Sequence, residues 1–485
     1  MTSFVQSSPS AHGVAAAGIA DYLDALERAG IEMHSLMVLR HGEVLAQGWW
    51  SPFAPDRRHL MYSLSKSFTS MAAGIAWGEG AFDLDDLVVD VLPEVVPDEL
   101  DDRFRGLRVR HVLSMATGHE QDTLEPGWRS ALARGDSVPD LARGLLTLPP
   151  EREPGSVFAY NQLATHTAAR IVERHAGVRL LDYLQPRLFE PLGITDPAWF
   201  GIGGHDLGFS GLHTHTGAIA ALGQLLLQRG RWGDAQLVPA EWIEQATRLQ
   251  QRNDPPDFTA DPEFGGSWDW RSGYGFQFWM GTHGYRGDGA YGQFCLVWPE
   301  EEVVVVTTAC TPDMGLQLDL AYRHLLPAVR GEGEVSAEAD AALAERLGAL
   351  EIPLPVDAGA AGSPGEVVFE RVGSQSAEPV AASGLSRVAI RPDGDGWVAR
   401  LQLGDVEGEL SIGRGLWLEG VWPVGAVPFV SAGGFGEDGV FRARLQMIET
   451  PHHLVVEGDP GSGTCTVRWN QPPLHSQDPA DHALT

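Results

Sequence analysis

A serine stands three residues before the only lysine of the chain, in the segment MYSLSKSFTS (residues 61–70). Every other basic side chain among the 34 lysines and arginines is an arginine. A serine hydroxyl is a poor nucleophile until a neighbouring base accepts its proton. Lysine becomes such a base when its surroundings lower its pKa, whereas the guanidinium of arginine stays charged in proteins. Ser63 and Lys66 therefore have the residue types that nucleophilic catalysis requires.

The spacing of this pair suits the start of a helix. Three residues make about one helical turn, so Ser63 and Lys66 are predicted to share a face. Apolar residues at helical spacing follow: Phe68, Met71, Ala72, Ile75 and Ala76. A helix N-terminus adds free N–H groups and a positive dipole end near Ser63. To act as a base, the lysine needs a pKa of about 7 instead of about 10.4, which corresponds to about 4 kcal/mol.

A surface lysine without a function is the alternative interpretation. With ordinary amino-acid usage, a serine precedes any lysine by three residues about 6–7% of the time. The spacing alone is therefore weak support. The uniqueness of Lys66 in the chain and its position before an apolar stripe favour the catalytic interpretation.

The segment YSLSKSFTSMAAGIAWGEGAFDLDDLVVDVLPE resembles the Ser-x-x-Lys segment of the serine β-lactamase and penicillin-binding superfamily. The resemblance is strongest to its class C branch, which includes family VIII esterases and D-aminopeptidases. It continues through LRVRHVLSMATGHE, EPGSVFAYNQLATHTAARIVERHAG, YLQPRLFEPLGI and YGQFCLVWPEEEVVVVTTA, over roughly residues 30–328. The resemblance implies a β-lactamase-like α+β or α/β fold, in which helices flank a mixed antiparallel sheet and an all-α region is inserted.

The second motif of that family, Tyr-x-Asn, falls on Tyr160, Asn161 and Gln162. The resemblance implies that Tyr160 helps Lys66 to move protons to and from the nucleophile and the leaving group. A core tyrosine is the alternative for Tyr160. Gln162 replaces the asparagine and keeps its amide one methylene further out, so Gln162, or Asn161 instead, is predicted to bind substrate.

The third motif departs from the family, which has Lys-Thr-Gly or His-x-Gly on a strand beside the site. The aligned stretch is HGYRGDGAYGQ, where the motif is placed at Gly287, Asp288 and Gly289. Arg286 is predicted to replace the missing positive charge. Asp288 is predicted either to favour a cationic substrate group or to pair with Arg286. Since the motif's charge binds the carboxylate of the antibiotic, its loss weakens the expectation of β-lactamase activity.

The oxyanion hole is predicted to come from backbone N–H groups of Ser63 and of the residue after the third motif, Ala290. Backbone donors survive side-chain substitutions, so the altered motif affects acyl-enzyme formation less than carboxylate binding. The predicted substrate-binding residues are therefore Asn161, Gln162, Arg286, Asp288, Gly289 and Ala290.

No metal and no organic cofactor is expected. His213 and His215 stand two residues apart, a spacing that allows two ligands on one face of a strand, but the sequence offers no third ligand. The aromatic and acidic segment 254–276 is equally consistent with a lid over the site and with a surface loop.

The order of the predicted elements indicates two domains. Helical patterns recur at 15–30, 107–116, 137–146, 162–176, 180–190, 216–229 and 315–327, and strand patterns occur in GYGFQFWM, GQFCLVW and EVVVVTTAC. We assign residues 1–330 to a β-lactamase-like domain and residues 331–364 to a helix and a linker rich in Pro, Gly and Ala. Short alternating segments then predict an all-β domain at 365–475, either lipocalin-like or a sandwich, with a tail at 476–485.

The amino-acid composition limits the kinds of partner and the location expected for this protein. A net charge of −31 argues against nucleic acid and anionic membrane surfaces, because both bind basic proteins. The three cysteines are too few and too scattered for a disulfide framework, and Cys295 and Cys310 read as small buried hydrophobes. The start of the chain lacks the pattern of a signal peptide, and no apolar run approaches the roughly 18 residues of a membrane span. We expect a cytoplasmic protein that acts on a small-molecule or short-peptide substrate. A homodimer is compatible with the sequence.

The predicted function is a serine hydrolase that forms an acyl-enzyme on carboxylic esters or amides of small molecules or short peptides. An acyltransferase or a peptide-cyclising thioesterase of the penicillin-binding type forms the same intermediate and is the first alternative. A ligand-binding or sensor protein without turnover is the second, because Gln162 and the third motif depart from the family.

Overall fold

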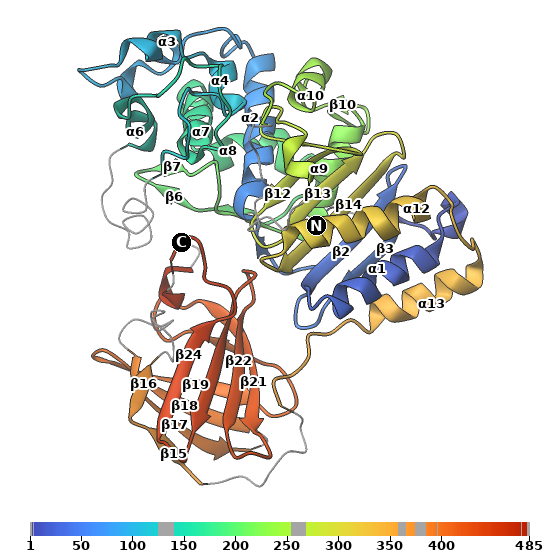
Figure 1. Ribbon diagram of the computed structural model, residues 1–485, viewed down its shortest axis with the longest axis vertical. Helices are drawn as coiled ribbons and strands as arrows, with labels where there is room; N and C mark the ends of the chain where they lie inside the picture. The colour runs from blue at the N-terminus through green and yellow to red at the C-terminus, as the bar shows by residue number, and fades with distance from the viewer. Residues whose placement is uncertain are drawn as a thin grey trace. The chain divides into compact units, whose positions relative to one another are not determined.

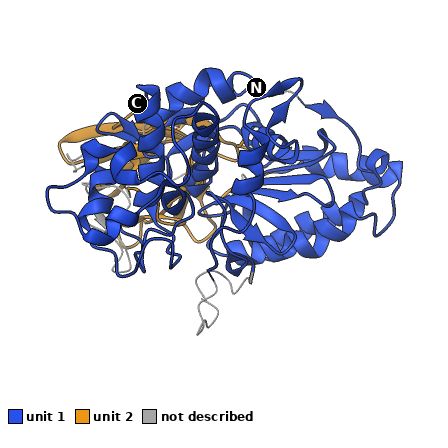
Figure 2. Ribbon diagram, turned by 90° about the horizontal axis from the view of Figure 1, so that it is seen from above, with its two compact units in different colours: residues 1–50, 54–350 blue, residues 51–53, 351–485 orange. Residues whose placement is uncertain are grey.

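The computed structural model describes residues 2, 4–124, 140–253, 268–356, 365–373, 385–394, 396–476 and 478–482. The chain forms two compact units, shown in different colours in Figure 2. The first unit comprises Met1–Trp50 and Ala54–Leu350, and the second comprises Ser51–Phe53 and Glu351–Thr485. Residues 254–267 of the predicted lid, 137–139 of a predicted helix and 357–364 of the predicted linker lie outside the described residues.

A mixed sheet forms the centre of the first unit (Figure 1). Its strands, in spatial order, are β1 (Val5–Gln6), β3 (Glu43–Trp49), β2 (Glu32–Arg40), β14 (Val303–Cys310), β13 (Gln293–Trp298), β12 (Gly284–Gly289) and β11 (Trp279–Gly281). β1 runs parallel to β3, and the other neighbours are antiparallel. The predicted mixed sheet is therefore confirmed.

The central strands are apolar along their whole length because both faces of the sheet are covered. Every residue of β13 and β14 is buried, and a run of four valines opens β14. Continuous apolar runs of this kind are typical of strands that are buried on both sides. Cys295 and Cys310 lie in these strands as buried thiols outside any disulfide, as predicted.

Helices cover the two faces of this sheet. On one face, Gly223 of α9 (Thr216–Leu227) lies so near Val304 that an added Cβ would be 2.4 Å from Val304 Cγ1. On the other face, Gln317 of α11 (Met314–Leu320) donates from Nε2 to Thr307 Oγ1 at 3.0 Å. Val304 and Thr307 are an odd number of residues apart on β14, so their side chains point to opposite faces.

The remaining helices of the first unit follow the predicted order. α1 contacts α12 and α13, and α7 contacts α2, α4, α6 and α8. The helices are α1 (Ala16–Arg28), α2 (Ser65–Gly78), α3 (Val88–Val91), α4 (Val109–Leu113), α6 (Leu141–Thr147), α7 (Gln162–Ala176), α8 (Leu180–Leu184), α10 (Ala240–Ala246), α12 (Leu326–Val329) and α13 (Ala337–Gly348). None of the described helices is long and apolar enough to cross a bilayer.

Short strands complete the first unit. They are β4 (His59–Leu60), β8 (Leu212–Thr214) and β5 (Ala198–Trp199) in one small sheet, the pair β6 (Gly201–Ile202) and β7 (His205–Asp206), and the pair β9 (Arg231–Trp232) and β10 (Ala235–Gln236). The strand predicted over 273–280 is wrong for most of its length, because the regular strand begins only at Trp279. Gln277 interrupts the extended backbone with a positive φ of 68°.

The described part of residues 365–475 in the second unit is all-β, as predicted, and a 3₁₀ turn follows at Pro479–His482. One sheet contains β15 (Val367–Phe369), β17 (Leu385–Asp393), β18 (Gly396–Leu403), β19 (Val406–Gly413), β21 (Pro428–Phe435), β22 (Phe441–Met447), β23 (His453–Asp459), β24 (Thr464–Trp469) and β16 (Arg371–Gly373), and β20 (Leu418–Val421) pairs with β21. One segment, 367–373, supplies the strands at both ends, so the sheet curls back toward itself. The aromatic rings of Trp397, Phe435 and Phe441 pack edge to face inside it.

Two glycines let β12 approach the turn that carries Ser63. A Cβ at Gly287 would lie 2.5 Å from Ser67 Oγ, and a Cβ at Gly289 would lie 2.1 Å from the carbonyl oxygen of Met61. Side-chain contacts this short do not occur, so any larger residue at Gly289 must push β12 away from the turn.

Replacing Gly289 with alanine is expected to lower the free energy of unfolding by about 1–3 kcal/mol, because the backbone oxygen of Met61 cannot move far. Gly217→Ala is the matched control, since nothing lies within 4 Å of a Cβ there and alanine favours the helix. Urea denaturation of both variants measures the difference. Equal stability of the two variants would contradict the close packing of β12.

Candidate active site

Ser63 and Lys66 lie where a tight turn enters a buried helix. Ser63 is in the 3₁₀ turn Tyr62–Leu64, where Tyr62 has a positive φ of 47°, and α2 begins at Ser65. Lys66 is only 1% exposed. Its Nζ donates a hydrogen bond to Ser63 Oγ at 3.1 Å. The two side chains that the spacing selected are therefore in direct contact.

Lys66 has two further hydrogen-bond acceptors. Its Nζ donates to Gln162 Oε1 at 2.7 Å and to the carbonyl oxygen of Phe209 at 2.9 Å. The ammonium group has three N–H donors, so these two acceptors and Ser63 together satisfy it. The nitrogen also lies 4.7 Å from the centre of the Tyr160 ring, a cation–π contact. Lys66 is thus held in one orientation, with Ser63 as a partner.

Tyr160 lies in an aromatic cluster above Lys66. Its ring stacks on Trp279 with centroids 5.2 Å apart and packs edge to face on Tyr274 at 6.0 Å. Burial and then the charge of Asp288 raise the pKa of Tyr160, whereas hydrogen bonds with Ser63 and Trp279 oppose the rise. Tyr160 is therefore a neutral phenol at ordinary pH, and its hydroxyl contacts the hydroxyl of Ser63.

The two amides of the second motif have different positions. Gln162 contacts Lys66 through Oε1. Asn161 is fully buried and caps α7, because its Oδ1 accepts the backbone N–H groups of Leu163 at 3.0 Å and Ala164 at 3.3 Å. The same oxygen accepts the hydroxyl of Thr123 at 2.8 Å. The structure thus brings Gln162 to the serine–lysine pair and gives Asn161 a role at the helix start.

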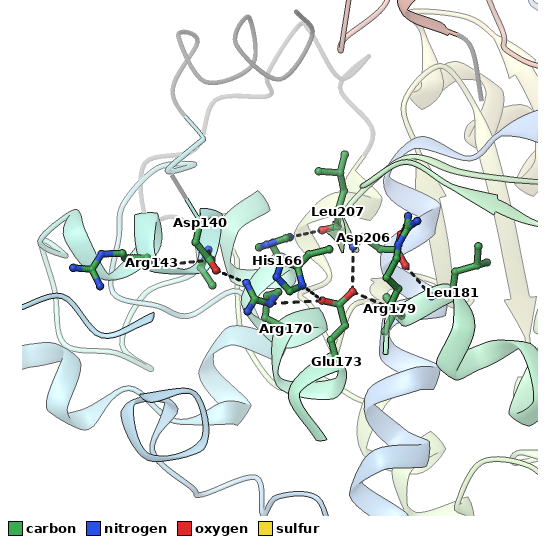
Figure 3. A network of polar contacts seen from close by, with 12 residues as sticks. Asp140, Arg143, His166, Arg170, Glu173, Arg179, Leu181, Asp206 and Leu207 are labelled. Carbon is green, nitrogen blue, oxygen red and sulfur yellow. Dashed lines mark hydrogen bonds and ion pairs between the residues drawn. The ribbon is translucent and has the colours of Figure 1, made fainter. Parts of the chain in front are cut away.

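A chain of ion pairs fixes the other end of α7, as Figure 3 shows. Arg170 pairs with Asp140 at the start of α6, and its Nε lies 3.6 Å from Oε2 of Glu173. Glu173 accepts the backbone N–H of Asp206 at 3.1 Å, and Asp206 pairs with Arg179. These contacts tie α7 to α6, β7 and the segment before α8, which fixes the position of Gln162.

The charged residues of the third motif pair with each other. Arg286 is 1% exposed, and its guanidinium lies 4.5 Å from the centre of the Trp270 ring. Its Nε donates to Asp288 at 3.1 Å and its Nη1 donates to Asp269 at 2.7 Å. The predicted pairing of Asp288 with Arg286 is present. Arg286 does not offer an unbalanced positive charge, because two carboxylates surround it.

Ala290 directly follows the part of β12 that packs on the Ser63 turn. The carbonyl oxygen of Ala290 accepts Gln293 Nε2 at 2.9 Å, and the same amide nitrogen donates to the Ala309 carbonyl at 2.9 Å. Gln293 is fully buried, so it fixes this turn against β14. The oxyanion hole formed by the N–H groups of Ser63 and Ala290 stays a prediction.

Gln277 is a buried residue near the site that the sequence did not indicate as important. Its carbonyl oxygen accepts Ser67 Oγ at 3.1 Å. Its side chain donates to the carbonyl of Leu113 at 2.8 Å and accepts Thr165 Oγ1 at 2.7 Å. Gln277 thus joins α2, α4 and α7. Its only sequence signal is a polar residue inside an aromatic run, which is too weak to predict these contacts.

The two histidines weighed as metal ligands interact with the backbone. His213 Nδ1 lies 3.1 Å from the Gly211 oxygen, and His215 Nε2 lies 3.2 Å from the Asp56 oxygen. Within the described residues, no group of three or more His, Cys, Asp or Glu side chains is arranged to hold a metal ion.

The fold and the site define a protein of the serine β-lactamase-like class, and comparison with known proteins agrees. A family model described as Beta-lactamase matches residues 19–326. The 6-aminohexanoate-dimer hydrolase of Paenarthrobacter ureafaciens is 30% identical over 302 residues, which cover 58% of this chain and 73% of that protein. The monacolin J acid methylbutanoyltransferase of Aspergillus terreus is 31% identical over 160 residues, 30% of this chain and 38% of that enzyme.

A solved structure extends the likeness in fold. The crystal structure of SurE with D-Leu has a TM-score of 0.50 and 18% identity, and covers 89% of this chain and 97% of that one. This chain belongs to the β-lactamase family and is an enzyme of that family. Relatives that hydrolyse and relatives that transfer acyl groups both occur within this similarity.

Asn161→Ala is expected to lower the free energy of unfolding by about 1–2 kcal/mol, because three hydrogen bonds to a buried helix cap are lost. Ser336→Ala is the control, since Ser336 caps α13 through one bond at 3.2 Å in a less buried place and is expected to lower it by less than about 1 kcal/mol. Urea denaturation measures both values. A smaller effect at Asn161 than at Ser336 would contradict the capping role.

Proposed function

We propose that this enzyme is a serine hydrolase that works through an acyl-enzyme on Ser63. The observation that carries this proposal is the 3.1 Å contact between Lys66 Nζ and Ser63 Oγ at a helix start. In the neutral form of Lys66, its two N–H groups still donate to Gln162 and Phe209, and its lone pair faces Ser63. That lone pair accepts the serine proton while the hydroxyl oxygen attacks a carbonyl carbon. The partners found for the Ser63 hydroxyl are Lys66 and Tyr160. Tyr160 is a neutral phenol, so Lys66 is the basic group beside this hydroxyl.

The proposed reaction has two half-reactions. Ser63 Oγ bonds to the carbonyl carbon, its proton moves to Lys66, and the carbonyl oxygen becomes an oxyanion held by the N–H groups of Ser63 and Ala290. The bond to the alcohol or amine then breaks, and the leaving group takes a proton from Lys66 through Tyr160. Water next attacks the ester carbon while Lys66 takes one of its protons. The bond from that carbon to Ser63 Oγ then breaks, Lys66 returns the proton to Oγ, and the acid is released.

The proposed substrates are carboxylic esters or amides of small molecules or short peptides. The hydrolase relative from Paenarthrobacter ureafaciens supports this class through its name. The proposed reaction needs water, side chains and backbone groups of the chain, and no cofactor. A cytoplasmic location and a homodimer stay proposals that rest on the sequence.

Acyl transfer is the second candidate. The similarity to a methylbutanoyltransferase favours it, because that enzyme transfers an acyl group by its name. Transfer shares the first half-reaction with hydrolysis and differs only in the nucleophile that attacks the acyl-enzyme. The serine–lysine–tyrosine geometry serves both reactions equally.

Incubation with a fluorophosphonate is expected to add one adduct to the wild-type protein, because an activated serine displaces fluoride from phosphorus. Intact-protein mass spectrometry measures the adduct. Ser63→Ala should carry none, whereas Ser67→Ala, four residues further along the chain, should still be labelled. A folded wild-type protein that stays unmodified would support the alternative of a binding protein without turnover.

Lys66→Arg is expected to slow this labelling about a hundredfold to ten-thousandfold, because arginine keeps the charge but cannot accept a proton. The rate constant comes from the mass spectra over time, and circular dichroism verifies that the variant is folded. Arg346→Lys, on the surface of α13, is the control for the exchange of these residue types. Labelling of Lys66→Arg at the wild-type rate would exclude lysine as the base.

A further inference from the structure

Two buried carboxylates share one guanidinium near the proposed active site. Arg286, Asp269 and Asp288 are 1%, 3% and 7% exposed. Asp269 accepts hydrogen bonds from Arg286 Nη1 at 2.7 Å, from Tyr322 Oη at 2.6 Å and from both N and Oγ1 of Thr282 at 2.8 Å. One positive charge faces two carboxylates. Because more donors are found for Asp269 than for Asp288, Asp288 is the less compensated of the two carboxylates.

The hydrogen bonds to Asp288 end on one of its two oxygens. Oδ2 accepts Arg286 Nε at 3.1 Å and Trp270 Nε1 at 3.0 Å. No residue in the described ranges donates a hydrogen bond to Oδ1. A carboxylate oxygen accepts about two donors. Among the described residues, one oxygen of Asp288 is thus held in place and the other has no donor.

This carboxylate lies within electrostatic reach of the reacting groups. Burial raises the pKa of Asp288, and the charges of Arg286 and Lys66 oppose that rise. Burial also raises the pKa of Tyr160 and of Tyr274, and the charge of Asp288 adds to both rises. Along β12, Gly287 and Gly289 face the Ser63 turn, so Asp288 between them points to the other face, beside Trp270. Asp288 therefore lies to one side of the reacting carbonyl carbon, at a distance over which its charge still acts on Tyr160.

We propose that Asp288 selects substrates that carry a protonated amine at a distance from the scissile bond, with the N–H group donating to Oδ1. This inference rests on the proposed function of Ser63. An ammonium group brings positive charge to Asp288 and donates to Oδ1 at the same time, whereas an apolar neutral group does neither. A carboxylate-bearing substrate meets repulsion at the same place.

The test uses three fluorophosphonates that differ only at the end of an alkyl chain, each in a series of chain lengths. The chain ends in a dimethylammonium group, in the isosteric neutral isopropyl group or in a carboxylate. The rate constant for modification of wild-type Ser63 is expected to be at least about tenfold larger for the ammonium probe than for the isopropyl probe at the best length. The carboxylate probe should be slowest.

Equal rates for the three probes, or a faster isopropyl probe, would overturn the role of Asp288 while leaving the activated serine established. No modification by any probe would instead overturn the proposed function and this inference with it. The wild-type measurement stands by itself, so it does not depend on the folding of a variant.

A pair of variants assigns the selectivity to one carboxylate. Asp288→Asn should reduce the preference for ammonium over isopropyl at least about fivefold, because the amide keeps the shape and loses the charge. Asp122 is the matched control, since its charge also raises the pKa of Tyr160 while its Oδ1 accepts the backbone N–H of Gln162 at 2.9 Å. Asp122→Asn should keep the preference. An equal loss in both variants would assign the selectivity to the general field and not to Asp288.

Discussion

A single buried ammonium group determines how the first unit must be assembled. Removing Lys66 from water is unfavourable by several kcal/mol unless its N–H groups find acceptors. One acceptor is local and two come from distant segments: Ser63 from the turn before α2, Gln162 from the start of α7, and Phe209 from the loop before β8. The segments therefore converge on one nitrogen, and the serine hydroxyl is one of the three groups that this convergence orients.

The strand β12 lies against the Ser63 turn because it has glycines at the points of contact. Gly287 and Gly289 let β12 touch the turn that carries Ser63, and Gln277 joins the helices below that turn. Neither the contact of β12 with this turn nor the contacts of Gln277 can be predicted from the sequence. The spacing of Ser63 and Lys66 and the apolar stripe of α2 were predictable because both are local to one helix. Gln277 was not, since its left-handed backbone interrupts what reads as a strand and its partners are far away in sequence.

The difference between local and distant contacts also explains which features of the third motif could be predicted. The departure from the family was visible in the sequence, and so was the pairing of neighbours Arg286 and Asp288 as one of two alternatives. Asp269 was not predictable, because it lies in an acidic and aromatic stretch that reads as a lid or a surface loop. Its hydrogen bonds, including the one from Arg286, show that the described end of this stretch is a buried part of the first unit.

Asp269 changes what Arg286 does electrostatically. An arginine beside a reacting centre ordinarily attracts anions, and with Asp288 as its single partner it would form a neutral pair. With Asp269 as a second partner, the same guanidinium supports two negative charges, and a net negative charge lies at the third motif where the wider family has a basic residue. A buried carboxylate that is not fully compensated is unfavourable for folding. A cationic group of a substrate offsets that charge only while it is bound, so the charge acts in recognition, whereas the folded chain gains nothing from it.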